Sequence, residues 1–195
     1  MNKIASCFEK ATKELLSNYK RTIKNGKNPY GIYWTEQDLV AGLVSRIKKL
    51  LKERSIEVHL NVCINKEFDY IKKHGSPWVS KWRRRFVDIV ILDEKKKEGD
   101  DEPFSLVAEM KFSYRKRGQS KDEQVIKQVE RDIERLNDLK NDDLCREAFF
   151  FYLDEYHKDE HRKEIKELIK AKCGQMVKPY YELKAINCDA YGRQI

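Results

Sequence analysis

The stretch SLVAEMKFSY, residues 105–114, places two charged side chains inside an apolar run. Side chains on a β-strand alternate between its two faces, so Glu109 and Lys111 would share one face. The other face is wholly apolar and is predicted to pack in the core: Leu106, Ala108, Met110 and Phe112. Because buried charge is costly, a strand that carries two charges on one face calls for a chemical reason.

The preceding apolar stretch, RRFVDIVILDE at residues 84–94, supplies a partner for these charges. Apolar residues occupy both of its faces, as in a central strand covered on two sides, and Asp88 interrupts them. The charged turn at 95–103 predicts an antiparallel hairpin in which Asp88 can lie across from Glu109. Two neighbouring buried carboxylates repel each other, and a divalent cation between them, Mg²⁺ or Mn²⁺, would remove that repulsion.

Lys111 fits the same chemistry, because its ammonium could reach a phosphate oxygen and stabilise the negative charge that grows during hydrolysis. The alternative is an ordinary cross-strand ion pair on a solvated sheet face. The apolar surroundings of both strands favour a functional site, since an unneeded charge is least tolerated there.

The rest of the chain predicts one α/β domain with a mixed central sheet flanked by helices. The expected helices are 4–23, 36–54, 121–139 and 158–172, and the remaining expected strands are 56–65, 147–156 and 180–187. We expect 1–195 to form a single domain, with a helical extension at 1–30, a core at about 35–155, and a final helix and strand within 156–195.

With Asp88 in FVDIVIL and Glu109 and Lys111 in AEMK, the chain resembles the PD-(D/E)xK nuclease superfamily. This resemblance, over about 35–155, implies a restriction-endonuclease-like α-β-β-β-α-β core. It implies Asp88, Glu109 and the backbone carbonyl of Met110 as metal ligands, and Lys111 as the catalytic lysine. Val87 stands where the name-giving proline would be.

Two further positions can be explained either by a role known from the family or by general helix structure. Glu36 matches the acid that many members carry on the first core helix, and is equally explained as a first-turn acid favoured by the helix dipole. Some members carry Gln-x-x-x-Tyr on the helix after the motif, where this chain has Gln128 and Asp132. Gln128 could hold a substrate phosphate or a metal-bound water, although a solvated helix face is the favoured explanation.

The formal charge of +8 and the pI of about 9.1 favour a polyanionic partner. Two basic stretches flank the motif strands, HGSPWVSKWRRR at 74–85 and SYRKRGQSK at 113–121. Cationic side chains there would contact phosphates, and aromatic ones could stack on bases. The candidate nucleic-acid-binding residues are Arg83, Arg84, Arg85, Tyr114, Arg115, Arg117 and Gln128.

We therefore expect a divalent-metal-dependent nuclease, with DNA favoured over RNA and a homodimer as a possible assembly. The alternative is a catalytically inactive module of the same fold that binds nucleic acid or a protein partner. The five cysteines are scattered without a CxxC pair, which indicates a reducing compartment, and no secretory signal or membrane span is expected. A cytoplasmic location follows as the expectation.

Overall fold

The computed structural model describes residues 3–24, 36–51, 56–63, 86–93, 102, 104–113, 122–154, 159–174 and 177–182. The helices are α1 (Lys3–Lys24), α2 (Glu36–Leu50), α6 (Asp122–Asn141) and α7 (Asp159–Cys173). The strands are β1 (Ile56–Cys63), β2 (Phe86–Asp93), β3 (Leu106–Ser113), β4 (Ala148–Asp154) and β5 (Val177–Glu182).

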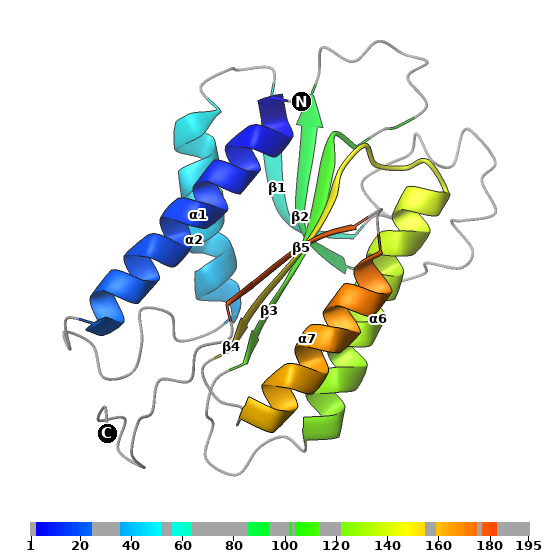
Figure 1. The fold of residues 1–195 in the computed structure, drawn as a ribbon. Coiled ribbons are helices and arrows are strands. Elements are labelled where there is room, and N and C mark those ends of the chain that lie inside the picture. The colour runs from blue at the N-terminus through cyan, green and yellow to red at the C-terminus, as the bar shows by residue number, and fades with distance from the viewer. Residues whose placement is uncertain are drawn as a thin grey trace.

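These elements form three layers, with α1 and α2 on one face of the sheet and α6 and α7 on the other (Figure 1). The sheet has the order β1-β2-β3-β4-β5. The first three strands pair antiparallel, whereas β3, β4 and β5 pair parallel through the crossover helices α6 and α7. The expected α/β class, the mixed sheet and the antiparallel hairpin of β2 and β3 are confirmed.

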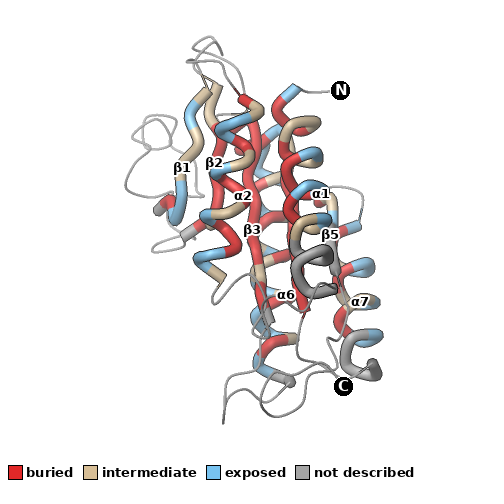
Figure 2. The backbone as a smooth tube through the Cα atoms, turned by 90° about the vertical axis from the view of Figure 1, so that its left-hand side faces the viewer, coloured by how far each residue is buried: buried red, intermediate tan, exposed pale blue. Residues whose placement is uncertain are grey.

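Alternation along the strands divides the core into two halves. Toward α1 and α2 the sheet presents Ile89, Ile91, Leu106, Ala108, Met110, Phe112, Phe149, Phe151 and Leu153. Toward α6 and α7 it presents Val90, Val107, Ala148, Phe150 and Tyr152. All seven residues of β4 are buried, as expected for a parallel strand covered on both faces. The neighbouring strand β3 is also buried along most of its length (Figure 2). Phe8 of α1 packs on Phe149 with ring centroids 4.6 Å apart.

The apolar residues of α6 recur at helical spacing, which directs one side of the helix to the sheet. Val125, Val129, Ile133 and Leu136 are all buried there, as the sequence predicts. After the helix, Asp143 adopts a left-handed conformation with φ 52°, and the Leu144 amide donates to the Leu139 carbonyl at 3.0 Å. This ending turns the chain directly into β4.

Some boundaries differ from the expected ones. Helix α2 ends at Leu50 rather than near residue 54, and β5 begins at Val177, three residues before the predicted strand. Pro179 lies inside β5, where the sequence had no strand signal. An edge strand tolerates proline because one side of it needs no backbone donor, and β5 is the last strand of the described sheet. None of the described helices is long and apolar enough to span a membrane.

Candidate active site at the separation of two strands

The motif strands separate at the position of the predicted acidic residues. The ladder between β2 and β3 runs from the pair Ile91 and Leu106 to the pair Ile89 and Ala108. Extending that register by one residue places Asp88 opposite Glu109, as predicted. On its other side, β3 stays paired with β4 all the way to Ser113. Beyond Ala108, the edge of β3 that faces β2 is therefore open to side chains.

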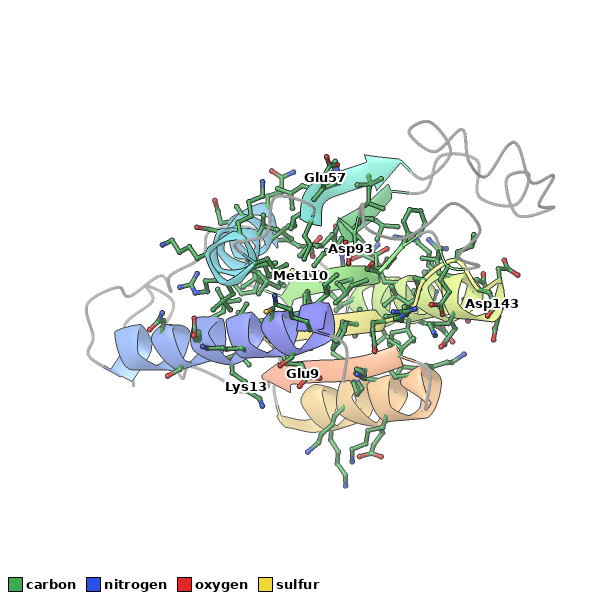
Figure 3. All side chains as sticks on the ribbon, turned by 90° about the horizontal axis from the view of Figure 1, so that it is seen from above. Glu9, Lys13, Glu57, Asp93, Met110 and Asp143 are labelled. Atoms are coloured by element: carbon green, nitrogen blue, oxygen red, sulfur yellow. The ribbon has the colours of Figure 1, made fainter. Side chains whose placement is uncertain are left out.

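Two carboxylates occupy this edge and accept hydrogen bonds from its backbone amides. The Met110 amide donates to Oδ2 of Asp88 at 2.7 Å, and the Phe112 amide donates to Oε2 of Glu36 at 3.1 Å. The N–H and C=O of one strand residue point to the same side. The Met110 carbonyl therefore faces the edge that carries Asp88, as a backbone metal ligand would require. The Met110 side chain does not take part in this edge, because it is buried on the α1–α2 face of the sheet (Figure 3).

Pairing is also interrupted on the other side of Asp88. The β1–β2 ladder contains the pairs Leu60 with Ile89 and Val62 with Val87, and it omits the intervening pair Asn61 with Asp88. Asn61 adopts a left-handed conformation with φ 50°, which asparagine tolerates better than most residues. Asp88 thus lies where β2 loses regular pairing to both neighbours. Backbone strain of this kind clusters at functional sites.

An alternating network of charges connects the site to α2 and α6. The Lys111 ammonium lies 3.1 Å from Oε2 of Glu36 and 3.7 Å from Oδ2 of Asp132. The Arg135 guanidinium bridges Oε1 of Glu109 and, at 3.2 Å, Oδ1 of Asp132. Each cation therefore joins two carboxylates, and Asp132 is shared by both.

Arg135 and the function of Asp132 were missed by sequence reasoning. Gln128 and Asp132, the two positions considered on this helix, are one turn apart, and three residues further the same face reaches Arg135. The helical period thus contained the signal. What it could not supply was the contact with Glu109, because that depends on how α6 lies across β3.

Burial raises the pKa of the two facing carboxyl groups. Burial is the main cause for Asp88, whose pKa is raised to about 6, with the charges of Glu36 and Asp132 acting in the same direction. The amide of Met110 opposes this shift. The pKa of Glu109 is raised well above its usual range, first by burial and then by the charge of Asp88, against the opposing effect of Arg135.

The lysine behaves in the opposite way to an isolated buried amine. Burial acts to lower the pKa of Lys111, but the carboxylates of Glu36 and Asp132 outweigh it, and its pKa is raised. Lys111 is therefore protonated at neutral pH. The pKa of Asp132 is also raised, mainly by burial, although Lys111 and Arg135 act to lower it.

The six groups have unbalanced charge. Four carboxylates face two cations, a formal charge of minus two when all are ionised: Glu36, Asp88, Glu109 and Asp132 against Lys111 and Arg135. Within the described residues, no cation lies within ion-pair distance of Asp88. A divalent cation beside Asp88 would restore neutrality.

The oxygen donors of the site fit Mg²⁺ or Mn²⁺, but they do not surround an ion completely. Among the described residues, no three His, Cys, Asp or Glu side chains are grouped as a complete metal site. Mg²⁺ keeps several waters and needs only one or two protein carboxylates. Asp88, Glu109 and the Met110 carbonyl supply such a partial set of hard oxygen donors.

The other predicted residues divide into two groups. The structure brings Glu36 to the motif through Lys111 and the Phe112 amide, which favours the site interpretation over a simple first-turn acid. Gln128 is exposed on α6, one turn before Asp132. Outside the described residues lie Arg83, Arg84, Arg85, Tyr114, Arg115 and Arg117.

Comparison with family models, curated proteins and solved structures finds no match to this chain.

Proposed function

We propose that this protein is a divalent-metal-dependent nuclease of the PD-(D/E)xK type that hydrolyses phosphodiester bonds, with DNA as the favoured substrate. One observation carries the proposal. Asp88, Glu109 and Lys111 converge where β2 and β3 separate, in a cluster whose formal charge is minus two when all of its groups are ionised. Such a cluster suits a divalent cation better than it suits a structural role, and the bound cation would in turn attract an anionic substrate.

Asp88 and Glu109, with the Met110 carbonyl, would hold the ion. When bound, Mg²⁺ or Mn²⁺ would supply the charge that polarises a phosphoryl oxygen and acidifies a water. The backbone amide of Met110 fixes the carboxylate of Asp88 at 2.7 Å and so orients it along the open edge. The side chain of Glu109 is only 3% exposed, which keeps its oxygen ligands in a medium of low dielectric constant.

Lys111 would act as a fixed cation in this reaction. Its raised pKa keeps it protonated, so it cannot serve as a general base at neutral pH. Glu36 and Asp132 hold the ammonium on two sides, at 3.1 and 3.7 Å. We assign these two acids as positioning residues for Lys111. The positioned ammonium would stabilise the negative charge that develops on the phosphate.

Chain connectivity supports a nucleic-acid substrate. In the antiparallel hairpin, the first residue of β2 and the last residue of β3 lie at the same end of the sheet, near Asp88 and Lys111. The basic stretches 74–85 and 113–121 join the strands at this end. Cationic residues attached beside a catalytic cluster would contact the phosphates of a bound strand.

The test is a panel of labelled DNA and RNA substrates, incubated with Mg²⁺ or Mn²⁺ and either wild type, Lys111→Ala or Lys127→Ala. Lys127 is an exposed lysine of α6 and controls for the loss of one positive charge. We expect metal-dependent cleavage by the wild type and by Lys127→Ala, reduced by at least about a hundredfold in Lys111→Ala. Cleavage that is unchanged in Lys111→Ala would refute the assigned role.

One contact favours a second candidate, an inactive module of the same fold that binds nucleic acid or a protein partner. The Arg135 guanidinium already neutralises part of the charge on Glu109, as a purely structural ion-pair network would. Calorimetry with Mn²⁺ on wild type and on Asp88→Ala separates the two. A nuclease binds the ion in a manner that depends on Asp88, whereas an inactive module need not bind it.

A further inference from the structure

Arg135 is the one cation that contacts a proposed metal ligand directly among the described residues. It projects from α6 onto the sheet and donates from Nη1 to Oε1 of Glu109. Its second terminal nitrogen, Nη2, donates to Oδ1 of Asp132 at 3.2 Å. Only 18% of the Arg135 side chain is exposed, so the contact lies in surroundings where an ion pair is poorly screened by solvent.

Arg135 and a bound metal ion would both interact with the carboxylate oxygens of Glu109. The side chain of Glu109 is 3% exposed, so water cannot replace a lost counter-charge. In the absence of a metal ion, the carboxylate needs Arg135, because an unpaired buried charge is strongly destabilising. In the presence of a metal ion, a guanidinium hydrogen-bonded to Glu109 competes for its lone pairs and repels the incoming cation.

We propose, on the basis of the nuclease function assigned above, that Arg135 is a resident counter-cation of Glu109 that a divalent ion must displace in order to bind. Arg135 then regulates the site by setting the concentration at which metal loads. Asp132 makes the exchange feasible, since it holds Nη2 and so keeps the guanidinium beside the cluster after Glu109 is released.

The length and shape of the side chain support such an exchange. A planar guanidinium donates to two carboxylates at once, and breaking one contact leaves the other intact. Glu109 and Asp132 come from different elements, β3 and α6, so the guanidinium can rotate toward α6 without moving the strand. The side chain of Asp132 is 13% exposed, against 3% for Glu109, so the charge of the guanidinium is less costly to hold beside Asp132.

The experiment measures Mn²⁺ affinity by calorimetry for wild type, Arg135→Met, Arg135→Lys and Arg131→Met, together with the thermal midpoint of each protein in chelator. Arg131 is exposed one turn earlier on α6, so Arg131→Met removes the same charge without touching Glu109. We expect Arg135→Met to lower the midpoint in chelator and to bind Mn²⁺ about ten- to a hundredfold more tightly. Arg131→Met should leave both quantities close to the wild-type values.

Arg135→Lys keeps the charge but loses the two-pronged contact, so we expect it to bind Mn²⁺ a few-fold more tightly than wild type. If Arg135→Met does not fold, the Mn²⁺ affinity of Arg135→Lys tests the inference in its place. Unchanged or weaker binding of Mn²⁺ by the folded variants, with normal binding by wild type, overturns this inference and leaves the nuclease proposal standing. No binding by any of the four proteins overturns both, whereas binding by the Arg135 variants alone supports the inference.

Discussion

Replacing Asp88 with asparagine is expected to stabilise the metal-free protein at alkaline pH. The substitution keeps a side-chain oxygen that can accept the Met110 amide, which now lies 2.7 Å from Oδ2 of Asp88. It removes the charge that burial, Glu36 and Asp132 all disfavour. It also relieves Glu109, whose pKa is raised partly by the charge of Asp88.

The size of the effect follows from the pKa. Folding raises the pKa of Asp88 to about 6, from about 3.9 in an unfolded chain, and each unit corresponds to about 1.4 kcal/mol. Two units set a ceiling of about 3 kcal/mol. Because Asp88 is only partly buried, solvent screening reduces the expected gain to about 1–2 kcal/mol.

The sign depends on pH in a defined window. Between about pH 4 and pH 6 the folded state binds more protons at Asp88 than the unfolded state, so the wild type loses stability as the pH rises. Asparagine does not titrate. The difference in the free energy of unfolding between Asp88→Asn and wild type should be close to zero near pH 4 and reach its full value by about pH 8.

Urea unfolding in chelator at both pH values measures this difference, and a second series with saturating Mn²⁺ measures the metal effect. Mn²⁺ should raise the stability of the wild type and leave Asp88→Asn unchanged. Asp138→Asn, at an exposed position of α6, is the control and should lie within about 0.5 kcal/mol of wild type. A loss of stability in Asp88→Asn, equal at both pH values, would refute the reasoning, because Asp88 would then be a favourable ionised acceptor.

Three further substitutions test other parts of the structure. Lys111→Met should destabilise the metal-free protein by about 1–3 kcal/mol at neutral pH in urea unfolding, because Glu36 and Asp132 lose a shared cation. A neutral or stabilising effect would indicate a dispensable ion pair. Asn61→Gly should be nearly neutral and Asn61→Val should cost about 1–2 kcal/mol, since the left-handed backbone opposes a β-branched residue; equal effects would show that this conformation is not required. Phe149→Ala should cost about 3–5 kcal/mol in the same assay, because it leaves a cavity against Phe8 of α1, and a small loss would mean that α1 is not firmly packed on the sheet.

Local patterns were sufficient for the elements and for the central pair of acids. The period of two in β3 and the helical period in α6 depend on side-chain direction alone, so they are readable from the chain. The position of Asp88 opposite Glu109 was predictable because a short connection between two apolar strands favours an antiparallel hairpin. The expected strand at 180–187 overlaps β5 only at residues 180–182, because Pro179 interrupts the pattern and the earlier residues of β5 are a strand only through their pairing with β4.

The sequence by itself determined which residues are buried and that Asp88, Glu109 and Lys111 share one face of a sheet. Only the tertiary structure decided which charges surround them. Glu36 reaches Lys111 because α2 begins at the open end of β3, and Arg135 reaches Glu109 because α6 crosses the same strand. Such contacts join residues that are much farther apart along the chain than one turn of a helix or one repeat of a strand. They therefore follow from how the helices pack on the sheet. This packing sets the charge of the site, and we expect it to set the metal affinity.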